Sequence, residues 1–373
     1  MEKSNFIEEL MKSNCIKQGL FKLKSGDMSK YYFNIKNLIS NPQLLKLIGD
    51  ALYEKLPEFD IICGIPYGGL PIASYISTTY NKPMIFVRDK TKSYGMGNLI
   101  EGEFSSDQKC IIIDDVLTTG MSLNETFNFL KDKVNIVDIA VVVDRQQHYL
   151  LDFEYKYLIC KNDLVKYYLK KYTDEKNSKI CFSADIQDPN KLIDILSLIG
   201  DRIIICKLHM DIIDLNLYEG EFINDIIKLS ISKNFLLMED RKFVDISYIV
   251  DKQYNKYKNW IDLVTVHGSC NSEVISSLSG ALLVANMSNN SFDFVSECIG
   301  IADKYEDRVI GFITQYRIDH KGLICMTPGV SSKKTSIGDQ KYRTIDEIDT
   351  DIVIIGRAIY NSENYVKSID SFF

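Results

Sequence analysis

Residues 235–246, reading FLLMEDRKFVDI, bring together the side chains best suited to chemistry in this chain. The apolar run 235–238 is typical of a buried strand and leads directly into acidic and basic residues. Side chains alternate along a strand, so Asp240 and Lys242 should lie on the same side. Asp245 would serve the same cluster or reach into a neighbouring subunit. Two carboxylates stay beside one ammonium only if their charges are compensated. The alternative is a solvated, salt-bridged turn.

A second stretch, residues 110–122 (CIIIDDVLTTGMS), predicts a phosphate site. A run of four apolar residues is followed by two aspartates. A turn that contains threonines and a glycine then leads into a helix near Ser122. The backbone amides of such a turn, with a helix N-terminus, form a cradle for phosphate. The aspartates suit ribose hydroxyls or Mg²⁺. The candidate ligand-binding residues are Asp114, Asp115, Val116, Thr118, Thr119, Gly120 and Ser122. A capped loop without a ligand is the alternative.

The elements around the second stretch alternate between helix and strand. Amphipathic helices are expected at residues 5–13 and 42–55. Short apolar strands are expected at 61–62, 84–87, 110–113 and 136–143, separated by segments long enough for helices. This alternation favours an α/β domain with a mostly parallel sheet.

After residue 179, strand-type runs occur eight times, mostly separated by helix-length segments. They lie at 180–183, 202–206, 235–238, 263–266, 281–285, 309–313, 323–326 and 352–355. Eight such units predict a TIM barrel, whose chemistry sits at the C-terminal ends of the strands. Polar residues and glycines do follow most of these runs, as at Asp185, Lys207 and Arg357. Residues 1–165 and 179–373 should therefore form two domains, joined by a short, charged and partly helical junction at 166–178.

Charge and cysteine content narrow the class of protein. The net charge of −7 argues against nucleic acid or an anionic membrane as a partner. The nine cysteines form no CxxC pair and read as buried, reduced thiols of a cytoplasmic protein. The N-terminus has no signal-peptide core, and no run approaches 18 apolar residues. A soluble protein is expected.

Residues 110–122 resemble the phosphoribosyl-pyrophosphate (PRPP) motif of type I phosphoribosyltransferases, and the flanking segments resemble orotate phosphoribosyltransferases. These segments are a hood at 21–34 (FKLKSGDMSKYYFN), a pyrophosphate loop at 63–71 (CGIPYGGLP), a mobile loop at 88–95 (RDKTKSYG) and VDRQQ at 143–147. The resemblance implies a catalytic role for Arg88 and Lys92. It implies that the aspartates and turn residues above bind the substrates together with Lys24, Tyr32, Phe33, Tyr67, Gly68, Lys90, Tyr94 and Arg145. It also implies Mg²⁺ held through PRPP, with Asp114 and Asp115 as candidate ligands.

Residues 179–373 resemble orotidine 5′-monophosphate (OMP) decarboxylases throughout. The landmarks are SADI, KLHMDI, FLLMEDRKFVDI and the closing TPGV, GDQKYRT and IIGRAIY. The implied catalytic tetrad is Lys207, Asp240, Lys242 and Asp245, the last donated across a dimer interface. Lys242 would stabilise the developing carbanion and protonate it, without a cofactor. The other implied substrate contacts are Ser183, Asp185, His209, Ile246, Met287, Ser288, Pro328, Gln340, Tyr342, Gly356 and Arg357.

The two resemblances together predict a member of the bifunctional UMP synthase family, acting on small molecules as a homodimer with shared active sites. The chain departs from the family patterns at Asp89, which replaces a usual lysine. Ser247, Tyr248 and Ile249 stand where a glycine, an asparagine and a threonine are usual. Two alternatives remain at this point. The first domain would use a base other than orotate, or one half would be a degenerate binding or dimerisation module.

Overall fold

The computed structural model describes residues 2–23, 26–88, 99–147, 151, 153–215, 219–287, 293–332, 335–337 and 340–373. The chain divides into two units: residues 1–17 with 32–163, and residues 18–31 with 164–373. This division runs close to the expected boundary at residue 165. The two units are not each one continuous stretch of sequence, however, because residues 18–31 belong to the second unit.

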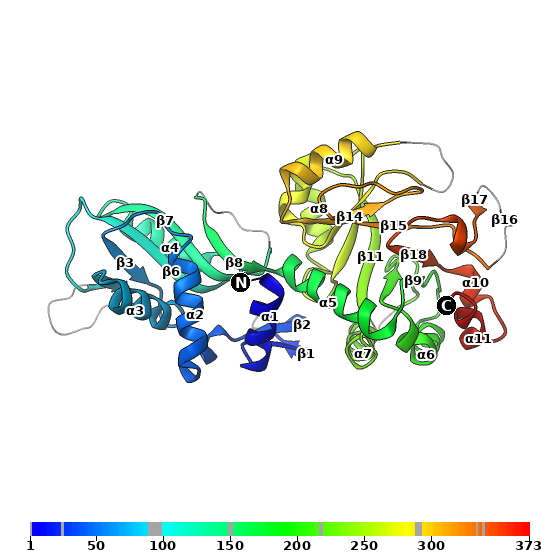
Figure 1. The fold of residues 1–373 in the computed structure, drawn as a ribbon, viewed down its shortest axis with the longest axis horizontal. Helices are drawn as coiled ribbons and strands as arrows, with labels where there is room; N and C mark the ends of the chain where they lie inside the picture. Colours follow the sequence, from blue (N-terminus) through cyan, green and yellow to red (C-terminus); the bar gives the residue numbers. More distant parts are fainter. Residues whose placement is uncertain are drawn as a thin grey trace. The chain divides into compact units, whose positions relative to one another are not determined.

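A six-stranded sheet forms the first unit, in the order β5-β4-β3-β6-β7-β8 (Figure 1). Neighbouring strands are parallel except for the pair β4–β5. The predicted α/β domain with a mostly parallel sheet is therefore confirmed. The strand before the phosphate turn is longer than expected, so Asp114 and Asp115 lie within it. The strands are β3 (Ile61–Gly64), β4 (Met84–Val87), β5 (Ile100–Glu101), β6 (Lys109–Leu117), β7 (Asn135–Asp144) and β8 (Lys156–Cys160).

Four helices accompany this sheet: α1 (Lys3–Lys12), α2 (Pro42–Tyr53), α3 (Gly69–Tyr80) and α4 (Met121–Leu130). Helix α2 begins where the sequence signals a start, because the Asn41 side chain accepts a hydrogen bond from Leu44 N at 3.1 Å and Pro42 occupies the first turn. Helix α3 contacts β3 and β6. The packing of α3 fixes the position of the loop that precedes it, residues 65–68.

The second unit is a closed barrel of eight parallel strands, in the order β10-β11-β12-β13-β14-β15-β18-β9. This confirms the predicted TIM barrel. Figure 1 shows the barrel with its helices around it. The strands are β9 (Ile180–Ser183), β10 (Ile205–Leu208), β11 (Leu236–Phe243), β12 (Leu263–His267), β13 (Ala281–Val284), β14 (Val309–Ile313), β15 (Ile324–Thr327) and β18 (Ile352–Ile355).

The barrel strands are buried because helices cover their outer faces. In α6 the buried residues Leu192, Ile195, Leu196 and Ile199 recur at the spacing of one helix face. These residues join a single hydrophobic core with strand residues such as Phe182. The helices of this part are α5 (Lys161–Lys176), α6 (Pro189–Ile199), α7 (Glu219–Ser232), α8 (Ser247–Tyr254), α9 (Val295–Lys304), α10 (Arg357–Tyr360) and α11 (Tyr365–Asp370).

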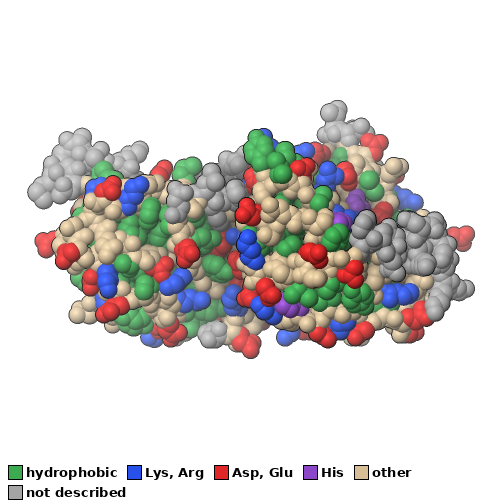
Figure 2. Space-filling model, turned by 90° about the horizontal axis from the view of Figure 1, so that it is seen from above, with side chains coloured by type: hydrophobic (Ala, Val, Ile, Leu, Met, Phe, Trp, Pro, Cys, Tyr) green, Lys and Arg blue, Asp and Glu red, His purple; other side chains and the backbone are tan. Residues whose placement is uncertain are grey.

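Helix α5 runs through most of the expected junction at 166–178, so a helix rather than an extended tether follows the sheet in the chain. Two short hairpins complete the structure: β1 (Ile16–Lys22) with β2 (Met28–Phe33), and β16 (Thr335–Ile337) with β17 (Gln340–Tyr342). Acidic and basic side chains are interspersed over the face shown in Figure 2. Among the described residues, no helix combines the length and the apolar character needed to cross a membrane.

Candidate active sites

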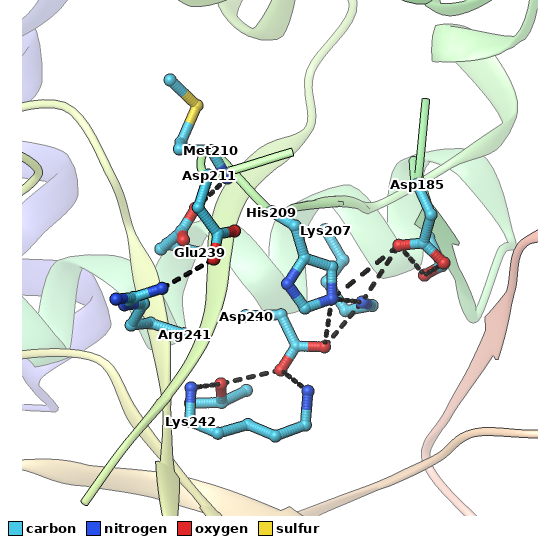
Figure 3. Close-up of polar contacts among 11 residues, drawn as sticks. Asp185, Lys207, His209, Met210, Asp211, Glu239, Asp240, Arg241 and Lys242 are labelled. Atoms are coloured by element: carbon cyan, nitrogen blue, oxygen red, sulfur yellow. Dashed lines mark hydrogen bonds and ion pairs between the residues drawn. The ribbon is translucent and has the colours of Figure 1, made fainter. Parts of the chain in front are cut away.

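Three charged side chains meet at the C-terminal ends of two neighbouring barrel strands, β10 and β11 (Figure 3). Lys207 Nζ lies 2.6 Å from Asp240 Oδ2, and Lys242 Nζ lies 2.8 Å from Asp240 Oδ1. Asp240 therefore bridges two ammonium groups, one through each carboxylate oxygen. The sequence-based expectation that Asp240 and Lys242 share one side of a strand agrees with this geometry.

The backbone at the end of β11 is irregular at this point. The pairing of β11 with β12 shifts register between Glu239 and Phe243. Lys242 adopts a φ of 51°, in the left-handed region that few residues other than glycine enter. Lys242 N donates to Thr265 Oγ1 on β12 at 2.9 Å. The strand is thus bent where Lys242 turns back toward Asp240.

Asp240 and Lys207 hold each other in the ionised state. Burial by itself would raise the pKa of Asp240, but Lys207, a hydrogen bond from His209 and the Lys242 ammonium hold that pKa well below its usual range. Burial likewise opposes the charged form of Lys207. Asp240 and Asp185 overcome this effect and raise the pKa of Lys207 above its ordinary value. The pKa shifts of Asp240 and Lys207 therefore both favour the charged forms of this pair.

Further polar residues surround this cluster. Asp185 Oδ1 lies 3.6 Å from Lys207 Nζ and accepts a hydrogen bond from Ser183 Oγ at 3.1 Å. His209 Nε2 lies 3.2 Å from both Lys207 Nζ and Asp240 Oδ2. His209 thus contacts the charged residues directly.

The loop that carries His209 is held by the two chain neighbours of Asp240 (Figure 3). Glu239 is fully buried, and its Oε2 accepts a hydrogen bond from Met210 N at 3.2 Å. Arg241 Nη1 donates to Asp211 Oδ2 at 2.6 Å. Side chains alternate along β11, so Asp240 and Lys242 share the charged cluster while Glu239 and Arg241 reach this loop. Burial raises the pKa of Glu239 to about 8.

A cavity of about 190 Å³ opens beside the charged cluster. Ten of the predicted decarboxylase residues line it: Ser183, Asp185, Lys207, Asp240, Lys242, Met287, Pro328, Tyr342, Gly356 and Arg357. They come from the ends of several strands that are far apart in the sequence. The barrel therefore brings these residues together around one space.

The other predicted decarboxylase residues lie elsewhere or outside the description. Asp245 is exposed, and one of its carboxylate oxygens accepts a hydrogen bond from its neighbour Ile246 N at 2.7 Å. Ile246 is also exposed, with 65% of its surface accessible. Ser288 lies outside the described residues, and only the backbone of Gln340 is described, in β17. In the single chain, Asp245 does not join the cluster of Asp240 and Lys242.

Sequence reasoning missed several residues of this site. Thr265 Oγ1 donates to Asp240 Oδ1 at 2.8 Å, yet a lone threonine in the run LVTVH gives no signal beyond β propensity. Other missed residues line the cavity: Met238, Val284, Asn286, Ile313, Gly329 and Ile354. Val284, Ile313 and Ile354 lie at or next to the last position of their barrel strands, where an alternation rule applied to each strand end could have found them.

A second candidate site lies in the first unit, at the turn between β6 and α4. A small cavity of about 50 Å³ is lined by residues of the predicted phosphate motif: Asp114, Val116, Leu117, Thr118, Thr119, Gly120, Met121, Ser122 and Leu123. Gly120 has a φ of 78°, which a glycine adopts without strain. Burial and then the neighbouring Asp115 raise the pKa of Asp114 well above its usual range.

The predicted pyrophosphate loop lies against the same aspartates. A Cβ atom built on Gly68 would come within 2.1 Å of the Asp115 carboxylate carbon, so any larger residue at this position would displace that carboxylate. Tyr67 beside it is 71% exposed. The two carboxylates supply oxygen ligands of the kind Mg²⁺ prefers. Among the described residues, no group of three or more histidine, cysteine or acidic side chains could hold a metal ion. Two carboxylates therefore fit a Mg²⁺ ion that takes its other ligands from a substrate and water.

Two residues predicted to contact orotate lie together in the first unit. The Arg145 guanidinium lies over the Phe33 ring, 5.5 Å from its centroid. Tyr32, next to Phe33, is 43% exposed. Arg88 Nη1 pairs with Glu101 Oε1 at 2.8 Å. The remaining predictions for this site, Lys24, Lys90, Lys92 and Tyr94, lie outside the described residues.

Comparison with known proteins assigns a family to each half of the chain. Residues 178–372 match the orotidine 5′-phosphate decarboxylase / HUMPS family, and residues 34–169 match the phosphoribosyl transferase domain. Uridine 5′-monophosphate synthase of Bos taurus is 28% identical over 94% of this chain and 92% of its own length.

Each half also matches proteins with a single activity. Orotate phosphoribosyltransferase of Methanocaldococcus jannaschii is 40% identical over 39% of this chain and 83% of its own length. Orotidine 5′-phosphate decarboxylase of Pichia kudriavzevii is 34% identical over 50% of this chain and 81% of its own length. The chain therefore belongs to the orotidine 5′-phosphate decarboxylase / HUMPS family, with its decarboxylase barrel joined to an orotate phosphoribosyltransferase domain as in the bifunctional UMP synthases.

Proposed function

We propose that the chain performs two successive reactions of pyrimidine synthesis. Its first unit joins orotate to PRPP and releases pyrophosphate, and its barrel removes carbon dioxide from the resulting OMP to give UMP. The observation that carries the proposal is the buried bridge Lys207–Asp240–Lys242 beside a cavity at the C-terminal end of the barrel. The 40% identity of the first unit to an orotate phosphoribosyltransferase favours orotate over another base.

In the decarboxylation, Lys242 is the residue that acts on the reacting carbon. Loss of carbon dioxide leaves negative charge on a ring carbon, and an ammonium fixed beside that carbon stabilises the charge and then delivers a proton. Asp240 holds the Lys242 ammonium at 2.8 Å. Lys207 contacts the other carboxylate oxygen of Asp240, so Lys242 is positioned before the substrate arrives. The reaction needs no cofactor in this scheme.

The cavity lining suggests how OMP lies in the barrel. Arg357 and Gly356 follow β18, at the place where barrels often bind phosphate. Ser183 and Asp185 offer a hydroxyl and a carboxylate to the ribose. Met287 and Pro328 supply apolar contacts for the pyrimidine ring. This orientation brings the ring to Lys242.

In the phosphoribosyl transfer, the turn after β6 holds the 5′-phosphate of PRPP through Thr118, Thr119 and Ser122. Asp114 and Asp115 bind the ribose hydroxyls and the metal. Mg²⁺, when bound, neutralises the charge of the departing pyrophosphate. Phe33 and Tyr32 stack on orotate, and Arg145 pairs with its carboxylate. Arg88 and Lys92 supply positive charge to the leaving group.

The decarboxylase site is completed by a second copy of the chain. Asp245 is exposed beside three exposed apolar side chains, Val244 (54%), Ile246 (65%) and Tyr248 (64%). An apolar surface of this kind favours a protein–protein contact. A homodimer would bury it and bring Asp245 to the partner's cluster. The nine free, buried cysteines fit a reducing compartment, which we take to be the cytoplasm.

A product assay with the full-length protein tests the proposal. With orotate, PRPP and Mg²⁺, UMP should be the nucleotide that accumulates. Lys242→Ala should lower decarboxylation by at least ~100-fold and let OMP accumulate. Lys228→Ala, an exposed lysine on α7, is the matched control and should behave like the unmodified protein. If orotate is not consumed, competition by other pyrimidines and by purines will show whether another base is used. OMP accumulating in the unmodified protein would indicate an impaired barrel.

A further inference from the structure

The hairpin β1–β2 precedes the sheet domain in sequence, yet most of it forms part of the barrel unit. Residues 18–31 belong to the same unit as residues 164–373. Lys30 N donates to the Asn259 carbonyl at 3.1 Å, and Ser29 Oγ donates to the same carbonyl at 3.2 Å. Leu20 packs against the hydrophobic core of the barrel. The second strand of the hairpin is thus bound to the segment that leads into β12.

A buried ion pair lies at the middle of this contact. Lys30 Nζ lies 2.6 Å from Asp262 Oδ2, and the side chains of both residues are completely buried. Tyr31 Oη donates to Asp262 Oδ1 at 2.7 Å, and Leu237 N donates to Oδ2 at 2.8 Å. The Asp262 carboxylate thus accepts hydrogen bonds at both oxygens and faces a cation. A buried pair persists when its remaining lone pairs are satisfied in this way.

The pair joins the two strands that carry the decarboxylation chemistry. Asp262 immediately precedes β12, and Leu237 lies near the start of β11. Farther along the same two strands lie Asp240 and Lys242 on β11 and Thr265 on β12. Removing Lys30 would leave an uncompensated carboxylate between the strand starts. The carboxylate would then draw in water or shift, and the strands would move with it.

We propose that the β1–β2 hairpin is an integral part of the decarboxylase barrel and that Lys30 is a positioning residue for decarboxylation, acting through Asp262 on β11 and β12. This inference rests on the proposed function of the barrel. The decarboxylase family model matches residues 178–372, and β2 lies outside this range. The inference implies that β2 is nevertheless needed for full decarboxylation. Strand β2 continues into Tyr32 and Phe33, the candidate orotate contacts, so one strand carries residues for both reactions.

Point variants of the full-length protein test the inference. Lys30→Met keeps the aliphatic volume and removes the charge. The double variant Lys30→Met/Asp262→Asn removes both charges and keeps an acceptor for Leu237 N. Lys22→Met, an exposed lysine on the same hairpin, is the matched control. Decarboxylation of supplied OMP is measured as kcat and KM separately, with kcat expressed per UMP-binding site found by titration. If a variant only reduced the fraction of molecules with a folded barrel, kcat per UMP-binding site would stay unaltered.

Lys30→Met should lower kcat per site by ~10-fold or more, with a smaller change in KM, because the reactive groups are misplaced rather than removed. The double variant should return to within ~3-fold of the unmodified protein, since buried partners couple strongly. Lys22→Met should leave both constants unaltered. The inference is overturned if Lys30→Met decarboxylates normally, or if the double variant is no better than Lys30→Met. If Lys30→Met does not fold, a folded and active double variant supports the inference. An unmodified protein that does not decarboxylate OMP would instead overturn the proposed function.

Discussion

Thr265 Oγ1 lies between Asp240 and Lys242, 2.8 Å from Asp240 Oδ1 and 2.9 Å from Lys242 N. It donates to the carboxylate and accepts from the amide, so one hydroxyl fixes both the side chain of Asp240 and the backbone of Lys242. Its position on β12 ties these residues to the neighbouring strand.

Thr265→Val should therefore impair decarboxylation without removing a charged group. The substitution keeps the shape of the side chain but leaves a buried amide and a carboxylate oxygen short of one partner, at a cost of ~1–3 kcal/mol. We expect kcat for supplied OMP to fall ~10- to 100-fold, while UMP affinity changes less. Thr265→Ser retains the hydroxyl and should recover most of the loss. Equal activity of the valine and serine variants would contradict this role.

Glu239 should make the stability of the barrel depend on pH. Its pKa is raised from 4.5 to about 8 by burial, so the folded state keeps a proton that the unfolded state has lost. The stabilisation is complete below about pH 4.5, decreases as pH rises toward 8, and is gone above the folded pKa.

Glu239→Gln should flatten this dependence, because the amide does not titrate and still accepts from Met210 N. Urea unfolding at pH 5 and pH 8.5, followed by a probe in the barrel, measures the difference between the two pH values. The exposed residue Glu297 provides the control Glu297→Gln, which should unfold like the unmodified protein. An unaltered pH difference in Glu239→Gln would show that Glu239 is ionised in the folded state.

If Asp245 serves the partner's site, two inactive variants should complement each other. Lys242→Ala and Asp245→Asn are each expected to lose most decarboxylation. In a mixed dimer, one site combines an intact Lys242 with the partner's intact Asp245, because a twofold interface is reciprocal. Random mixing should then restore about one active site in four. A mixture that gains no activity over its components would place Asp245 in its own chain's site or outside the reaction.

Removal of Mg²⁺ should separate the two reactions. With excess chelator, formation of OMP from orotate and PRPP should stop, because the charge on the leaving pyrophosphate is no longer neutralised. Decarboxylation of supplied OMP should continue at its normal rate. Asp114→Asn/Asp115→Asn should weaken the first reaction selectively and raise the Mg²⁺ concentration needed for half-maximal rate. Loss of both reactions on chelation would contradict the metal-free scheme for the barrel.

Much of the fold follows from the sequence because strands and helices leave periodic patterns. The eight strand-type runs correspond to the eight barrel strands, and the residues after them line the cavity beside Asp240. The motif at 110–122 likewise forms a turn with its own small cavity. The hydrophobic pattern of each segment and the direction of the strands are sufficient to predict these features.

What the sequence could not predict depends on contacts between distant segments. Lys30 and Asp262 are separated by 232 residues, and the hood motif around Lys30 gives no signal of its pairing with Asp262. Thr265 has no local signal for its hydrogen bond to Asp240. The bend at Lys242 arises from the register shift against β12, which a strand pattern does not reveal.

The left-handed backbone at Lys242 has a consequence for how this barrel can evolve. A side chain in that region costs about 1 kcal/mol relative to ordinary backbone. Glycine would relieve the strain, so Lys242→Gly should leave a barrel at least as resistant to heat as the unmodified one and without catalytic power. Stability alone would therefore favour glycine at this position, and the lysine there serves the chemistry at the end of the barrel instead.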